Sequence, residues 1–167
     1  MDLDTLSKVG EFLGGTVVIV SLLYLAAQAR QSAQQQRSEN YGRTVDRASS
    51  VMSQWASNPD LNKLVINGTV CLGGLDPYDR IRFLWQMNEI FAVYEFTFEQ
   101  KNLKVLPPHV WERYNQHLNM WISLPGVREF WKTNPGDFSE AFTEYVNLQM
   151  QKSGLSESEA KAFWGLS

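Results

Sequence analysis

The sequence predicts an all-α protein in which a single N-terminal transmembrane helix continues into a cytoplasmic helical bundle. Residues 12–29 form an uncharged run of 18 residues, and the remaining chain shows helical spacing of apolar residues broken by prolines, without an alternating strand pattern. Hydrophobic residues make up 44% of the 167 residues and aromatic residues 13%. This composition argues against disorder and favours a compact domain after the anchor.

The uncharged run at residues 12–29 has the length of a membrane anchor. At about 1.5 Å per residue it spans about 27 Å as a helix, close to the hydrocarbon thickness of a bilayer. Its centre, VVIVSLLYL, is apolar on every side, which suits lipid or a fully buried soluble helix. A cleaved secretory signal is the third alternative, because AQA at residues 27–29 fits a cleavage site, but the acidic start MDLDTLSKVGE opposes it. We therefore expect residues 1–29 to be an N-terminal segment and an uncleaved anchor.

Basic residues flank the expected anchor unequally. Only Lys8 precedes the run, whereas four arginines follow it closely: Arg30, Arg37, Arg43 and Arg47. Because basic flanks stay on the cytoplasmic side, we expect a single-pass inner-membrane protein with its C-terminal domain in the cytoplasm. The lone cysteine, Cys71, fits that reducing compartment.

Residues 30–58 are expected to form a helical neck and the first helix of the bundle. The neck is rich in helix formers and has no large apolar residue up to position 40. An apolar seam with spacings of four and three residues follows, made of Tyr41, Val45, Ala48, Met52 and Trp55. This spacing fits a monomeric stalk and a self-associating one equally well.

The remainder of the domain, residues 59–167, is expected to be helical throughout. Pro59 follows the end of the first helix, Asn67 and Gly68 read as a turn, and Ser156 begins a capping box with Glu159. Pro77, after the capping residue Asp76, opens the helix that we expect to be the most buried, because it is nearly apolar all round. The expected helices are residues 61–67, 77–101, 108–124, 125–131, 138–152 and a short one after 156.

Four segments form a recognisable arrangement along the chain: SLLYLAAQARQ, RFLWQMNEIFAVYEFTFEQKNL, HVWERY and PGVREFWKTNPGDFSEAFTEYV. Together they resemble a family of small uncharacterised bacterial membrane-anchored proteins. The similarity covers about residues 10 to 147. The resemblance implies an N-terminal transmembrane helix and a helical soluble domain, and it implies no reaction, substrate or cofactor.

Three polar residues on apolar helix faces are candidates for a pocket: Asn88, Glu95 and His117. A carboxylate among apolar neighbours needs a partner or has a raised pKa. Glu95 is therefore either a base or ligand-binding acid in a pocket, or a packing residue held by an arginine or tyrosine such as Arg113 or Tyr114. A single histidine on such a face is in most cases a satisfied core residue. The packing interpretation is the simpler one for both residues.

Known catalytic patterns are missing from the sequence. It has no Glu-x-x-His pair for a carboxylate metal centre, no Gly-x-Ser-x-Gly and no phosphate-binding loop. We therefore expect no metal, no cofactor and no catalytic residue, and we interpret Cys71 as inert packing. Without residues 1–29 the chain has 14 basic and 15 acidic residues, which excludes the charge footprint of a nucleic-acid-binding protein.

Paired aromatic residues suggest binding surfaces, because adjacent helical residues cannot share one stripe. One ring of Phe130 and Trp131, and one of Phe163 and Trp164, must face a neighbouring helix, another subunit or the bilayer surface. The candidate interface residues are Tyr41, Val45, Met52, Trp55, Trp131 and Trp164. The sequence thus predicts a membrane-anchored interaction or scaffold protein, not an enzyme, that binds membrane lipid and forms a homo-oligomer or binds another membrane protein. The alternative is a small-ligand sensor or enzyme with a pocket around Asn88, Glu95 and His117.

Overall fold

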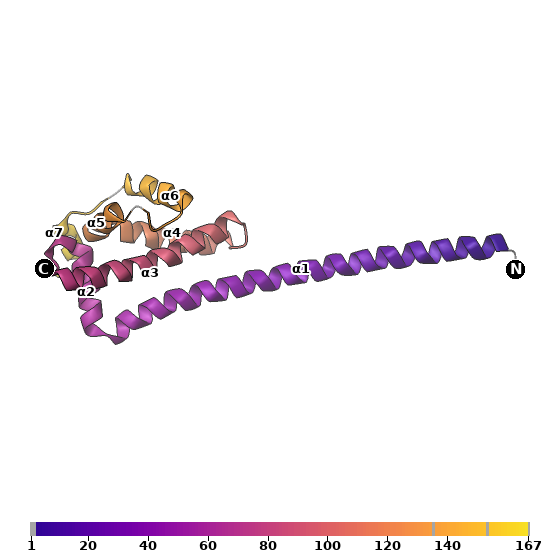
Figure 1. The fold of residues 1–167 in the computed structure, drawn as a ribbon, viewed down its shortest axis with the longest axis horizontal. Coiled ribbons are helices and arrows are strands. Elements are labelled where there is room, and N and C mark those ends of the chain that lie inside the picture. The colour runs from indigo at the N-terminus through magenta and orange to yellow at the C-terminus, as the bar shows by residue number, and fades with distance from the viewer. Residues whose placement is uncertain (1–2, 135, 153, 167) are drawn as a thin grey trace. The chain divides into compact units, whose positions relative to one another are not determined.

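The structure, a computed structural model, describes residues 3–134, 136–152 and 154–166, with the side chains of residues 3–16, 37 and 40 left out. All regular structure in these ranges is helical, which confirms the all-α prediction (Figure 1). The elements in chain order are α1 (Leu3–Ser57), α2 (Pro59–Val70), the 3₁₀ turn η1 (Leu72–Gly74), α3 (Pro77–Asn102), α4 (Pro108–Ser123), α5 (Pro125–Thr133), α6 (Glu140–Met150) and α7 (Glu157–Phe163).

The chain divides into two compact units, Met1–Tyr41 and Gly42–Ser167, here called unit 1 and unit 2. In unit 1, the large apolar side chains between Val17 and Leu25 are each 56–67% exposed. No helix within the described part of the chain is both long and apolar enough to cross a membrane. Of the expected anchor, residues 12–16 lie outside the residues whose side chains are described.

Several helices of unit 2 begin where their local sequence predicts. Asp76 accepts hydrogen bonds from the amides of Tyr78 and Asp79 at the start of α3, as predicted. Helix α2 begins at Pro59, two residues before its expected start, because the Asn58 side chain accepts a hydrogen bond from the amide of Leu61 at 3.1 Å. Ser156 and Glu159 form the expected reciprocal capping box of α7. Such caps satisfy amides that have no partner inside the helix, so neighbouring residues suffice to fix these starts.

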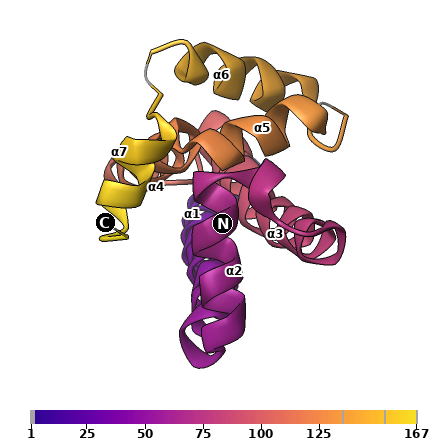
Figure 2. The same cartoon turned by 90° about the vertical axis from the view of Figure 1, so that its left-hand side faces the viewer.

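Asn67 and Gly68 do not form the predicted turn. Helix α2 continues through both residues to Val70, and Gly68 is buried. A Cβ atom added to Gly126 of α5 would overlap the carbonyl oxygen of Gly68, and one added to Gly68 would overlap the ring of Phe83. The glycines are therefore needed for close helix packing, with α5 lying between α2 and α6 (Figure 2).

Helix α3 is central to the core of unit 2, as predicted, but Asn88 and Glu95, which we expected among its apolar residues, do not lie on its buried face. The buried large residues are Phe83, Met87, Ile90, Phe91, Val93, Tyr94 and Phe98. Asn88 and Glu95 are half-buried, and Ile81 on the same helix is 48% exposed. Because apolar residues occur on every side of this helix, spacing alone could not select the core face.

The part of α1 in unit 2 packs by a face that matches the predicted seam only at Ala48 and Trp55. Its buried residues are Thr44, Val51 and Trp55, whereas Met52 is exposed. The ring of Trp55 meets that of Trp121 on α4 edge to face, with 5.5 Å between ring centroids. Large side chains thus hold α1 against the core, and grooves are left on both of its flanks.

Candidate functional site

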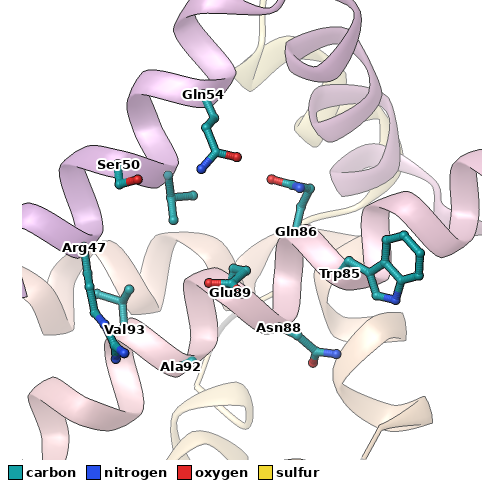
Figure 3. A pocket seen from close by; sticks show the side chains of 10 residues that line it. Arg47, Ser50, Gln54, Trp85, Gln86, Asn88, Glu89, Ala92 and Val93 are labelled. Carbon is teal, nitrogen blue, oxygen red and sulfur yellow. The ribbon is translucent and has the colours of Figure 1, made fainter.

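An open groove in unit 2 lies between α1 and α3 (Figure 3). Its volume is about 680 Å³, which lies within the range of about 300–1,000 Å³ typical of ligand pockets. Helix α1 contributes Arg47, Ser50, Val51 and Gln54, and α3 contributes Trp85, Gln86, Asn88, Glu89, Ala92 and Val93. We call this feature the α1–α3 groove.

Helical periodicity places both rows of side chains in the α1–α3 groove. Positions 47, 50, 51 and 54 recur at three- and four-residue steps, so they share one face of α1 over two turns. The α3 residues repeat in the same way from 85 to 93. The two helices therefore line the groove with two parallel rows, with Arg47 and Trp85 at its opposite ends in Figure 3.

The amide of Gln86 has a fixed orientation in the groove. The indole N–H of Trp55 donates to Oε1 of Gln86 at 2.7 Å, and an indole nitrogen can only donate. The Nε2 hydrogens of Gln86 are therefore left to donate elsewhere. Gln54 faces Gln86 across the groove in Figure 3 and offers both a donor and an acceptor.

The groove carries one charge of each sign. Arg47 from α1 and Glu89 from α3 are both exposed, and neither takes part in an ion pair between described residues. The guanidinium carbon of Arg47 lies 6.0 Å from the ring centroid of Phe96. Trp85 is 64% exposed, unlike the buried aromatic residues of the core. The groove could therefore bind a surface that carries both a positive and a negative group.

The three residues predicted to share a pocket do not come together around a described cavity. Asn88 lines the α1–α3 groove, and its Oδ1 atom is buried without a hydrogen-bond partner among the described residues. His117 lines a second groove on the other flank of α1. Glu95 lines neither of these two grooves. The prediction of one pocket failed because it assumed the wrong buried face of α3.

Glu95 has a structural partner, but not one of the two we expected. Its Oε1 atom accepts a hydrogen bond of 2.6 Å from the backbone N–H of Ser139, the residue that caps α6. A carboxylate at a helix N-terminus is stabilised by the unpaired amides and by the helix dipole. Arg113 instead lies over the ring of Tyr114, with 5.7 Å from its guanidinium carbon to the ring centroid. The expectation of Arg113 or Tyr114 as partner was therefore wrong, and the packing role of Glu95 gains support.

The second groove has a volume of about 350 Å³ and lies among α1, α3 and α4. It is lined by Ala48, Ser49, Met52, Ile90, Val93, Tyr94, Arg113, Tyr114 and His117. Burial, with a further contribution from Tyr114, raises the pKa of Tyr94 above its ordinary value. Its hydroxyl is therefore protonated at neutral pH, so it can form hydrogen bonds there but cannot act as a base.

Half of the predicted interface residues serve the internal packing of unit 2. Trp55 and Trp131 are buried, and the indole N–H of Trp131 donates to Oδ1 of Asn147 at 2.9 Å. The indole N–H of Trp164 donates to the hydroxyl of Thr69 at 3.0 Å, which ties the end of α7 to α2. Trp55 and Trp131 are therefore core residues instead of surface residues, and Trp164 is half-buried against α2.

The other three predicted interface residues keep some exposure. Tyr41 is 36% exposed and Met52 42%, and Val45 is half-buried. Both aromatic pairs are now placed: Phe130 is fully buried beside Trp131, whereas Phe163 is 48% exposed beside the half-buried Trp164. Packing inside unit 2 therefore accounts for both Phe130 and Trp131, but in the second pair only for Trp164.

Sequence patterns did not predict Trp85, Gln86 and Glu89 as groove residues, and they indicated only a role in membrane topology for Arg47. One signal was present: a helix with apolar residues on every side must leave some of them outside a core. This pattern predicts that an aromatic residue on α3 is exposed, but it does not identify the residue. Which residue stays exposed depends on where α1 packs, and local spacing does not encode that position.

Neither a reactive thiol nor a metal site is indicated among the described residues. A hydrogen bond to Glu157, followed by burial, raises the pKa of the Cys71 thiol, which favours its unreactive protonated form. No group of three or more histidine, cysteine, aspartate or glutamate side chains is placed to hold a metal ion among residues with described positions.

The fold and the grooves define an all-α helical protein with open grooves beside α1. The chain matches no protein-family model, no curated protein and no solved structure.

Proposed function

We propose that this chain is a membrane-anchored interaction protein, held in the bilayer by residues 12–29 and binding a protein partner through its helical unit 2. The observation that carries the proposal is the exposed apolar run in unit 1. It comprises Val17, Val18, Ile19, Val20, Leu22, Leu23, Tyr24 and Leu25, each more than half exposed.

The distribution of these side chains around the helix favours lipid as their cover. Consecutive helical residues point in directions about 100° apart, so positions 17–25 cover every side of α1. A partner helix would cover one stripe only, whereas a bilayer covers the whole circumference. Burying an aliphatic side chain contributes about 1.5–3 kcal/mol, so leaving seven of them and Tyr24 in water would be strongly unfavourable.

The flanking charges support a cytoplasmic location for unit 2. Arg30 follows the run at once, and Arg37, Arg43 and Arg47 continue the basic flank, against Lys8 on the other side. Transfer of this basic flank across an inner membrane is disfavoured, so the domain is retained on the cytoplasmic side.

The chemistry of unit 2 supports binding over catalysis. Glu95 is engaged by the Ser139 amide, and the Cys71 thiol is held protonated. The α1–α3 groove offers charges, amides and an exposed indole, which are typical of protein recognition. One observation favours the alternative, a small-ligand sensor: the buried, unpartnered Oδ1 atom of Asn88 beside the groove.

Membrane fractionation of the full chain tests the anchor. We expect the wild-type protein to sediment with membranes and to resist an alkaline wash. Replacing Ile19 and Leu22 with Asp should release it, because a charged residue at the centre of the bilayer costs about 2.5–3.5 kcal/mol. Replacing Gln31 and Gln34 with Asp is the matched control, at the same spacing and outside the run, and should leave the protein in the membrane. Recovery of the wild-type chain in the soluble fraction without detergent would contradict the anchor.

A further inference from the structure

We propose that unit 2 binds a second copy of this chain across the α1–α3 groove, with Arg47 of each copy against Glu89 of the other. This inference rests on the proposed interaction function and names its partner. It does not depend on the orientation of the protein in the membrane.

The charges of the groove are self-complementary. In a two-fold interface, if residue i meets residue j of the partner, then j also meets i. Arg47 and Glu89 have opposite charges, lie on different helices and line the same groove. A two-fold axis along the groove therefore forms two opposite-charge pairs between the copies.

The uncharged polar residues of the groove are also self-complementary under a two-fold axis. Gln86 is held by Trp55 so that its Nε2 atom remains a donor, and Gln54 on the facing helix presents an amide oxygen that can accept. Donor and acceptor thus lie on opposite walls, as the two charges do. Two copies related by a two-fold axis satisfy both Gln54–Gln86 contacts at once.

Trp85 provides the aromatic anchor that such an interface needs. It is 64% exposed at one end of the groove (Figure 3), and tryptophan is the residue most enriched among those that dominate binding energy. The floor residues Val51 and Val93 are already buried within unit 2, so the apolar gain comes mainly from this ring. We therefore infer an interface of moderate strength that uses membrane confinement to raise the effective concentration of the copies.

The lining favours a second copy over a small ligand or a strongly charged partner. Six of the groove residues are polar or charged, namely Arg47, Ser50, Gln54, Gln86, Asn88 and Glu89, whereas small-molecule pockets are lined predominantly by apolar groups. A partner of one dominant charge would be attracted by one wall and repelled by the other. A second copy of the same surface places an opposite charge against each wall of the groove.

Two charge-reversal variants of the full-length protein test the pairing. Arg47→Glu gives a chain with two negative charges at this face, and Glu89→Arg gives one with two positive charges. Each variant alone should have a dimer dissociation constant raised at least about tenfold, because like charges are then opposed at both contacts. Mixed together, the two variants should pair as tightly as wild type, since each contact again joins opposite charges. Energy transfer between donor- and acceptor-labelled copies in lipid vesicles measures all three affinities.

Matched controls separate pairing from folding. Glu99→Arg reverses an exposed charge on the same helix outside the groove and should leave the dissociation constant unchanged. Trp85→Ala should weaken pairing about tenfold or more without lowering the melting temperature, as expected for an exposed anchor residue.

Three outcomes would overturn the inference. The first is unchanged pairing of each single variant, which would show that another surface carries self-association. The second is failure of the mixture to recover wild-type affinity while both variants melt like wild type. The third is wild-type protein that shows no energy transfer between copies in vesicles. None of these outcomes would contradict the membrane anchor, which membrane fractionation tests separately.

Discussion

Gly126 on α5 packs directly against the backbone of Gly68 on α2, so that these two helices touch with no side chain between them. The contact joins residues far apart in sequence and lies beside the fully buried ring of Phe83. We expect Gly126→Ala to lower the free energy of unfolding by about 3 kcal/mol or more, since overpacking against rigid backbone exceeds the usual penalty of about 1–3 kcal/mol.

Gly42→Ala is the matched control for this substitution. A Cβ atom at Gly42, inside α1, would meet nothing within 4 Å. Alanine there should stabilise the helix by about 0.5–1 kcal/mol. Chemical denaturation in detergent, followed by circular dichroism, measures both changes, and equal stability of the two variants would contradict the close approach of α2 and α5.

Glu95 should prove to be a packing residue. Glu95→Gln keeps an oxygen that accepts the Ser139 amide and should change the unfolding free energy by less than about 0.5 kcal/mol. Glu95→Leu removes the acceptor and should cost about 1 kcal/mol, as the loss of a helix cap does. If Glu95→Gln instead abolished a measurable activity at an unchanged melting temperature, the enzyme alternative would replace the packing role.

The reactivity of Cys71 should depend on pH with a midpoint above that of an ordinary cysteine. Its pKa is raised chiefly by the hydrogen bond to Glu157, so less thiolate is present at any given pH and alkylation is slow. Glu157→Gln removes the negative charge, lowers this pKa and should speed alkylation at pH 8 severalfold. Iodoacetamide labelling followed by mass spectrometry gives the rates. A pH midpoint unchanged by Glu157→Gln would contradict the assigned cause.

The basic flank should set the topology. A reporter active only in the cytoplasm, fused after Ser167, should be active, and one active only outside should be silent. Replacing Arg30 and Arg37 with Glu, and Asp2 and Asp4 with Lys, should invert this result, because the balance of basic residues decides orientation. The opposite reporter pattern for the wild-type chain would refute a cytoplasmic domain.

Local sequence was sufficient for helix starts and insufficient for helix faces. Asp76 and Ser156 cap helices through amides two or three residues away, so their roles could be predicted. We predicted a turn at Gly68 from its neighbours in the sequence. A glycine is needed there because α2 packs closely against Gly126 of α5, which is remote in sequence. The fold class and most helix positions therefore followed from the sequence, whereas α2 was predicted too short.

The candidate site was less predictable than the fold for the same reason. The α1–α3 groove exists because Thr44, Val51 and Trp55 face the core of unit 2, which leaves Arg47 and Gln54 on one flank of α1. The seam predicted from spacing chose Met52 instead of Val51, a rotation of one residue. Spacing cannot separate two such faces when both carry apolar residues.

Cross-linking of the neck in native membranes tests the central claim, that membrane-anchored copies of this chain bind one another. Single cysteines at Gln31, Gln34 and Ser38, in a Cys71→Ser background, report on the exposed positions that follow the anchor. We predict disulfide-linked dimers whose yield varies with helical periodicity and falls when Arg47→Glu is added. Absence of dimers at all three positions, together with a monomer mass for the detergent-solubilised wild-type protein, would contradict the claim.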